Sequence, residues 1–265
     1  MIATKFSSFI NKSQVYYTDS YSYILNVFTG GRPMITIRQA NQRGHGQHGW
    51  LTSWHTFSFA GYHDPEFMGI SALRVINEDH VAAGAGFPTH GHRDMEIISY
   101  VVQGELEHQD SMGNGSVIRR GDIQRMSAGS GVTHSEYNAS KTESLQFLQI
   151  WIQPDRKGVA PGYEQKRIAE IDQDHRLKLI ASPDGHRGSV HIHQDVRLYV
   201  ATLRPDESEH YRLNPHRSGY VHVVKGNLDL NDKPLSTGDG AFLINENALD
   251  FSSQNQAEFL FFDLP

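Results

Sequence analysis

Cysteine is absent from this sequence of 265 residues. The chain therefore has no disulfide framework, no thiolate metal site and no cysteine nucleophile, so any metal must be held by imidazole and carboxylate groups. Long hydrophobic runs are also missing, because no stretch approaches the roughly 20 apolar residues that a transmembrane helix needs. A clustered basic surface is lacking as well, and the formal net charge of −6 argues against direct nucleic-acid binding.

The first 33 residues lack the basic, apolar and small-residue regions of a secretory signal peptide. We therefore expect a cytoplasmic protein with no membrane attachment. This leader, residues 1–33, is interpreted either as a misassigned start, with Met34 as the true beginning, or as an extension of unknown role.

Short apolar or alternating runs recur along the chain between clusters of Gly, Asp and Asn. Such spacing is typical of antiparallel strands in a sandwich or barrel. No long amphipathic helix is evident, so the sequence predicts an all-β fold. The runs expected to form strands include residues 72–76, 96–102, 145–152, 198–203, 220–224 and 259–262.

A repeated pattern indicates that the chain contains two similar β-barrels. Residues 101–107 (VVQGELE) resemble residues 223–229 (VVKGNLD), and a Gly-Asp pair follows in each copy, at 121–122 and at 238–239. Each copy is expected to form strand, glycine turn, strand and a second turn. The alternative is two unrelated sheets that share common turn chemistry.

This repeat divides the chain into an N-terminal barrel over residues 34–155 and a C-terminal barrel over residues 156–265. The first copy contains two pairs of potential metal ligands, His90 with His92 and His134 with Glu136. When the copies are aligned, the residues at these four positions in the second copy are Arg212, Asn214, Phe251 and Ser253. The C-terminal barrel is therefore expected to be degenerate and free of metal.

The candidate metal site consists of His90 with His92 and His134 with Glu136. Residues two apart in a strand point to the same face, so each pair presents two ligand atoms to one side. Three imidazoles and one carboxylate suit Fe, Mn, Ni, Cu or Zn better than Ca or Mg. Four protein ligands would leave coordination positions open for a substrate and dioxygen.

A His-x-His pair is weak evidence by itself, because 16 histidines in a chain of this length predict roughly one such pair by chance. The second pair, His191 and His193, has no matching ligand pair downstream and is expected to lie in an exposed strand or loop. The glycines around His90 and His92, together with the His134 and Glu136 pair, support the first site.

These motifs resemble those of a known family. The residues similar to the two cupin motifs are Gly84, His90, His92, Glu96 and Gly104 in the first, and Gly121, His134 and Asn138 in the second. The segments that more specifically resemble pirin, a bicupin family, are WHTFSF (54–59), LRV (73–75), HQDS (108–111) and MSAGSGVTHSE (126–136). The resemblance covers residues 34–265 and is close to bacterial pirin-like proteins described as quercetin 2,3-dioxygenases.

The resemblance implies two tandem cupin barrels of the double-stranded β-helix, or jelly-roll, type with few short helices. It also implies one divalent transition metal, Fe(II) first and Cu, Mn, Ni, Co or Zn as alternatives, held by His90, His92, His134 and Glu136. Most cupins use the glutamate of the first motif, here Glu96, whereas pirins use that of the second. Glu96 is then either an acceptor for a ligand imidazole or a salt-bridge partner.

The implied activity is the opening of flavonols such as quercetin with dioxygen and release of carbon monoxide. Glu136 is implied to be either a plain ligand or the base that receives the proton of the substrate 3-hydroxyl. One alternative is an iron-sensing regulator that acts through contacts with protein partners, as eukaryotic pirins are described to do. Another is a different cupin enzyme, such as an isomerase that uses the metal as a Lewis acid.

Overall fold

The computed structural model describes residues 33–265, and the predicted leader lies outside them except for Pro33. The fold of this part is all-β with few short helices, as predicted. The helices are the 3-10 turns η2 (Ala40–Gln42), η3 (Ile168–Glu170) and η4 (His186–Gly188). No helix among residues 33–265 has the length and apolar character to cross a membrane. The cytoplasmic location stays a prediction.

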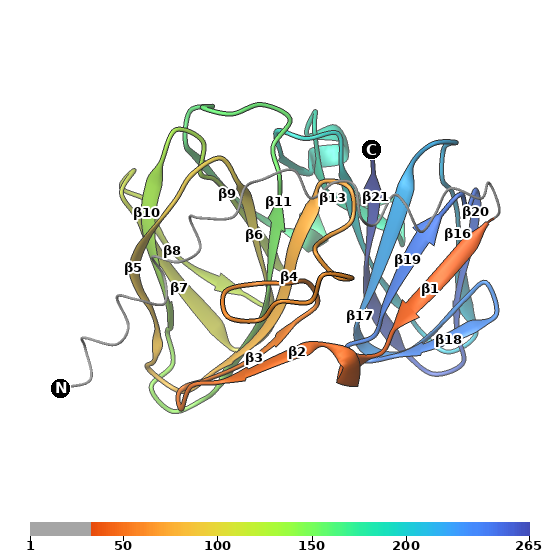
Figure 1. Ribbon diagram of the computed structural model, residues 1–265, viewed down its shortest axis with the longest axis horizontal. Helices are drawn as coiled ribbons and strands as arrows, with labels where there is room; N and C mark the ends of the chain where they lie inside the picture. The colour runs from red at the N-terminus through yellow and green to blue at the C-terminus, as the bar shows by residue number, and fades with distance from the viewer. Residues whose placement is uncertain (1–32) are drawn as a thin grey trace.

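Two sheets form the N-terminal barrel (Figure 1). Its strands are β2 (Gly44–Gln47), β3 (Leu51–His55), β4 (Leu73–Val81), β5 (Gly86–His92), β6 (Glu96–Gln103), β7 (Glu105–Asp110), β8 (Gly115–Arg119), β9 (Asp122–Ser127), β10 (Val132–Asn138), β11 (Leu145–Ile152) and β12 (Gly162–Arg167). A seven-stranded sheet in the order β12-β9-β6-β11-β4-β3-β2 faces a four-stranded sheet in the order β5-β10-β7-β8. The barrel interior lies between them.

The C-terminal barrel is a ten-stranded assembly built around β17 and β21. Its strands are β1 (Met34–Arg38), β13 (Lys178–Ser182), β14 (Val190–His191), β15 (Arg197–Leu203), β16 (Glu207–Arg212), β17 (Ser218–Leu230), β18 (Lys233–Ser236), β19 (Gly240–Ile244), β20 (Ala248–Ser253) and β21 (Ala257–Leu264). Its own core is apolar and includes the stacked rings of Phe251 and Phe259, 4.9 Å apart at their centroids.

The repeated glycine turn has the same backbone conformation in both barrels. Gly104 has φ +84° and Gly226 has φ +87°, which L residues with a side chain rarely adopt. A Cβ on Gly104 would lie 2.8 Å from the carbonyl oxygen of Ser144, and one on Gly226 only 1.8 Å from that of Gln256. Glycine is required at both turns, which explains why the repeat is readable in the sequence.

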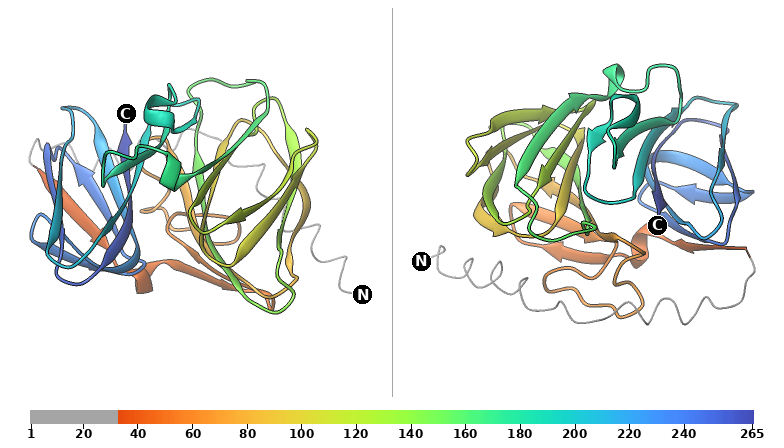
Figure 2. Two further views of the ribbon diagram at one scale, coloured as in Figure 1. Left: turned by 180° about the vertical axis from the view of Figure 1, so that it is seen from behind. Right: turned by 90° about the horizontal axis from the view of Figure 1, so that it is seen from above.

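Two strands cross the predicted division between residues 155 and 156. Strand β1 pairs with β19 of the C-terminal barrel, and β12 pairs with β9 of the N-terminal barrel. The segment after β1 runs between the barrels in Figure 2, and the backbone N–H of Ala40 in that segment donates to Asp239 Oδ1 at 2.7 Å. Each barrel is therefore completed by a strand from beyond the division.

The seven-stranded sheet is covered on both faces. Alternate residues of β6, such as Ile98 and Tyr100, pack in one apolar cluster with Leu198 and Phe262 of the C-terminal barrel. The residues between them, such as Ser99, face the N-terminal interior. This arrangement explains why β6 is buried over seven successive residues, whereas a half-buried strand would alternate.

One buried carboxylate links the two barrels. Glu258 of β21 accepts hydrogen bonds from the Tyr100 hydroxyl and from the Arg120 guanidinium, both at 2.6 Å. Glu258 is 5% exposed and Tyr100 is 6% exposed, so the hydroxyl has little access to water.

We predict that Glu258→Ala lowers the free energy of unfolding by about 1–3 kcal/mol, because it leaves the buried Tyr100 hydroxyl without an acceptor. Glu258→Gln keeps an acceptor oxygen and should lose less. Urea unfolding followed by circular dichroism measures both. An alanine variant as stable as the wild type would contradict this role for Glu258.

Candidate metal centre

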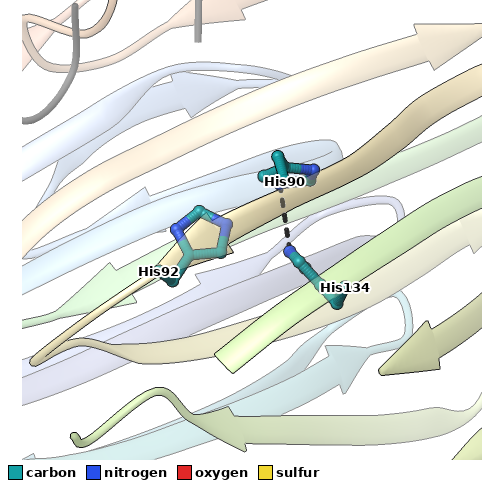
Figure 3. A group of neighbouring side chains, drawn as sticks. All are labelled: His90, His92 and His134. Atoms are coloured by element: carbon teal, nitrogen blue, oxygen red, sulfur yellow. Dashed lines mark hydrogen bonds between the residues drawn. The ribbon is translucent and has the colours of Figure 1, made fainter. Parts of the chain in front are cut away.

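The inner face of the four-stranded sheet gathers the predicted histidines. Strand β10 pairs with β5 so that His134 lies opposite His90 and Val132 lies opposite His92. Paired residues share a face, and so do residues two apart in one strand. His90, His92 and His134 therefore point into the barrel together, and Figure 3 shows their rings converging from the two strands.

The three imidazoles are in mutual contact. Their ring centroids are 4.5 Å apart for His90 and His134 and 4.8 Å apart for each of the other two pairs. One ligand atom from each of the three lies within 4.8 Å of the others. The rings of His90 and His134 approach each other through their Nε2 atoms, which are 3.1 Å apart (Figure 3).

The His90 ring is oriented by its own strand. Its Nδ1–H donates to the carbonyl oxygen of Pro88 at 2.8 Å. A carbonyl can only accept, so this bond leaves the lone pair of His90 on Nε2, which faces the other two rings. Metal-binding histidines commonly donate their second ring nitrogen to a carbonyl or carboxylate in this way.

Burial keeps two of these histidines neutral. It is the largest cause that lowers the pKa of His134 to about 2 and the pKa of His92 well below its usual value, and neighbouring histidines add to both shifts. Neutral imidazole is the form that binds metal ions. A cluster of neutral nitrogen donors, one of them with an unpartnered buried Nδ1 on His134, fits a transition-metal ion.

Glu136 lies on the same face of β10, two residues beyond His134. Its carboxylate is 1% exposed and accepts hydrogen bonds from Ser99 Oγ at 3.2 Å and Gln149 Nε2 at 2.7 Å. Burial raises its pKa, against the opposing effects of nearby histidines and of these hydrogen bonds. The structure thus brings His90, His92 and His134 together and places Glu136 beside them, in a second group with His134 and His108.

His108 is the residue that sequence reasoning missed. It lies on β7 directly opposite Glu136 and is fully buried. Its strand alternates buried Leu106 and His108 with exposed Glu107 and Gln109. Combined with the glycine turn at Gly104, this alternation could have placed His108 on the inner face.

Glu96 is not part of this site. Counting along β6 places Ser99 on the inner face and Glu96 on the opposite one. Glu96 is fully buried and accepts a hydrogen bond from Ser127 Oγ at 2.8 Å, and its other carboxylate oxygen lies 3.3 Å from His193 Nδ1. Of the two predicted roles, the acceptor for a ligand imidazole is wrong, because the partners of Glu96 are Ser127 and His193.

The second His-x-His segment was predicted to be exposed, and that prediction is wrong. Ile192 is fully buried in the cluster between the barrels, and the side chain of His193 is only 18% exposed. The segment lies where the linking chain packs against the N-terminal barrel, which local sequence does not reveal. The two groups of three potential ligands found among residues 33–265 both lie in the N-terminal barrel.

Comparisons with known proteins agree with this architecture. The family model described as Pirin matches residues 36–152, and that described as Quercetinase C-terminal cupin domain matches residues 179–264. A protein named quercetin 2,3-dioxygenase from Escherichia coli (strain K12) is 50% identical over 232 residues, 88% of this chain and 99% of that protein. A pirin-like protein from Caulobacter vibrioides is 39% identical, over 87% of this chain and 99% of its own.

Solved structures give the same result. The bacterial pirin YhhW from Escherichia coli in complex with nickel(II) is 50% identical, with a TM-score of 0.83 over 88% of this chain and 99% of that one. A second crystal structure of YhhW has a TM-score of 0.84 and the same identity.

We predict that metal-free protein loses stability as the pH falls from 7.5 to 5.5, in part through His134. The unfolded chain binds a proton at His134 near pH 6.5, whereas the folded chain does not until about pH 2, so acid favours unfolding. Below pH 6.5 the free energy of unfolding should fall by about 1.4 kcal/mol per pH unit because of His134, and His134→Gln should remove this part of the pH dependence. Urea unfolding at the two pH values measures it, and an unchanged dependence would contradict the assignment of a neutral buried imidazole.

Proposed function

Because the chain belongs to the pirin family, as its motifs predicted, we propose that it is a mononuclear metal dioxygenase that opens flavonols such as quercetin with O2 and releases carbon monoxide. The observation that carries the proposal is the convergence of three imidazoles, with one buried carboxylate beside them on the same sheet face. The name of the Escherichia coli relative supports the substrate class.

The ligands of the proposed ion are His90, His92, His134 and Glu136. The donor set favours a divalent transition metal, and the nickel(II) complex of the relative YhhW supports the same class. We propose Fe(II) as the native ion, because dioxygen chemistry at histidine and carboxylate ligands is typical of non-haem iron.

A divalent ion bound at these residues would lower the pKa of a flavonol hydroxyl by direct charge stabilisation. Glu136 is the proposed acceptor of that hydroxyl proton, because its buried carboxylate lies beside the three histidines. Ser99 and Gln149 hold the carboxylate in place through their hydrogen bonds.

An aromatic wall borders the histidines on one side. The Trp151 ring packs edge-on against His92 with 5.0 Å between centroids, and Phe59 packs against Trp151 at 5.3 Å. Flat apolar surfaces of this kind suit an aromatic substrate and exclude water from the reacting atoms.

The direct test mixes Fe(II)-loaded protein with quercetin under anaerobic conditions and then adds oxygen. We expect loss of the flavonol absorbance together with release of carbon monoxide. His90→Ala should abolish both. His45→Ala should keep them, because His45 is an exposed histidine on β2. If the loaded wild type consumes no quercetin and releases no carbon monoxide, the dioxygenase proposal fails and the regulatory alternative gains support.

We further predict that Glu136→Gln lowers kcat for quercetin by about 10²–10⁴-fold, the usual contribution of a general base. Glutamine keeps the size of the side chain but cannot take the proton. Glu107→Gln is the matched control, because Glu107 lies exposed on the adjacent strand β7. Steady-state kinetics with protein of equal metal content decide the result, and full activity in Glu136→Gln would exclude its role as base.

A further inference from the structure

Beside the three-histidine cluster, His108 has the hydrogen bonding of a metal ligand that no proposed ligand set includes. Its Nε2 lies 3.2 Å from Asp110 Oδ2 on the same strand. The Asp110 carboxylate is itself fixed, because it accepts hydrogen bonds from the side chain of Asn114 at 2.9 Å and from the backbone of Met112 at 2.9 Å. A carboxylate accepts, so His108 donates through Nε2 and its lone pair is on Nδ1.

This free nitrogen has no partner. His108 is 0% exposed, and its Nδ1 makes no hydrogen bond. A buried polar atom without a partner costs about 1–3 kcal/mol, so such atoms call for an explanation. An imidazole that donates one nitrogen to a carboxylate and leaves the other free has the arrangement of a carboxylate–histidine–metal triad.

His134 has the same unmet lone pair. Because His90 uses its Nδ1–H for Pro88, its Nε2 accepts, and the contact at 3.1 Å must be donated by His134 Nε2–H. The lone pair of His134 is then on Nδ1, which is also buried and without a partner.

These two histidines are in register with Glu136. On β10 and β7, Glu136 lies opposite His108 and His134 lies opposite Asp110, so all four side chains share the inner face. One ligand atom from each of His108, His134 and Glu136 lies within 4.8 Å of the others, and all three residues are buried. Two imidazoles whose Nδ1 atoms have no partner thus lie together with a carboxylate in the barrel interior.

We propose that the N-terminal barrel has a second, inner position for a divalent transition-metal ion, formed by His108, His134 and Glu136. The ion's charge of +2 would be balanced by the carboxylates of Glu136 and Asp110. A neutral imidazole has one free lone pair, so His134 serves the outer position through Nε2 or the inner one through Nδ1. The two positions therefore exclude each other and the chain holds one ion at a time.

Nickel(II) binding tests the inner position without the outer one. In the double variant His90→Ala/His92→Ala, isothermal titration with Ni²⁺ and metal analysis after gel filtration should still find one ion per chain. Adding His108→Gln should abolish that binding. Adding Asp110→Asn should weaken it about 10–100-fold, as expected when the partner of a ligating histidine is lost.

His80→Gln in the same double variant is the matched control and should leave Ni²⁺ binding unchanged. The His80 side chain is half-exposed and lies on the face of β4 that points away from the N-terminal interior, the same face as Ile76. The glutamine pair His90→Gln/His92→Gln preserves more volume and replaces the alanine pair if circular dichroism shows that the latter does not fold. A folded double variant that binds no Ni²⁺, or that binds it equally with and without His108→Gln, overturns the inner position. Flavonol turnover is not measured, so this outcome leaves the proposed dioxygenase activity untouched.

Discussion

The antiparallel pairing of β10 between β5 and β7 is the constraint on which the site depends. It sets His134 opposite His90 on one side and Asp110 on the other, and it sets Glu136 opposite His108. Because side chains alternate between faces, a slip of one residue in β10 would turn both of its potential ligands away from the interior. Between His134 and Glu136 the register against β5 shifts, so that Pro88 and Thr89 lie opposite the single residue Ser135. The Pro88 carbonyl in this irregular stretch orients His90.

The second barrel supports this polar interior from outside. The seven-stranded sheet presents Ser99 and Gln149 to Glu136 on its inner face and an apolar surface to the C-terminal barrel on its outer face. The C-terminal barrel fills its own interior with apolar side chains, Phe251, Phe259 and Phe261 among them, so the same repeated strand and turn pattern forms a packed core there. The pairing of β1 with β19 and of β12 with β9 ties the two barrels together.

Sequence periodicity predicted the features that depend on local spacing. Positive φ angles require glycine at the turns of Gly104 and Gly226, so the turns are visible in the sequence. The alternation of side chains along a strand likewise predicted the all-β fold and the shared face of His90 and His92. The pairing of β1 with β19 joins segments about 200 residues apart and has no local signal. The face of β6 on which Glu96 lies could not be predicted, because the sequence does not show which residues of β6 face the barrel interior. His108 was missed because its place in the site depends on its pairing with Glu136 of another strand, which the sequence does not show.

We propose that the inner face of the four-stranded sheet holds a single transition-metal ion. An anomalous difference map from crystals of the metal-loaded protein, collected at the absorption edge of the ion, tests it most directly. We expect a peak in the barrel interior at bonding distance from His134, about 2.0–2.1 Å for an imidazole nitrogen. A fully loaded crystal whose only peaks lie away from His90, His92, His108, His134 and Glu136 would contradict it.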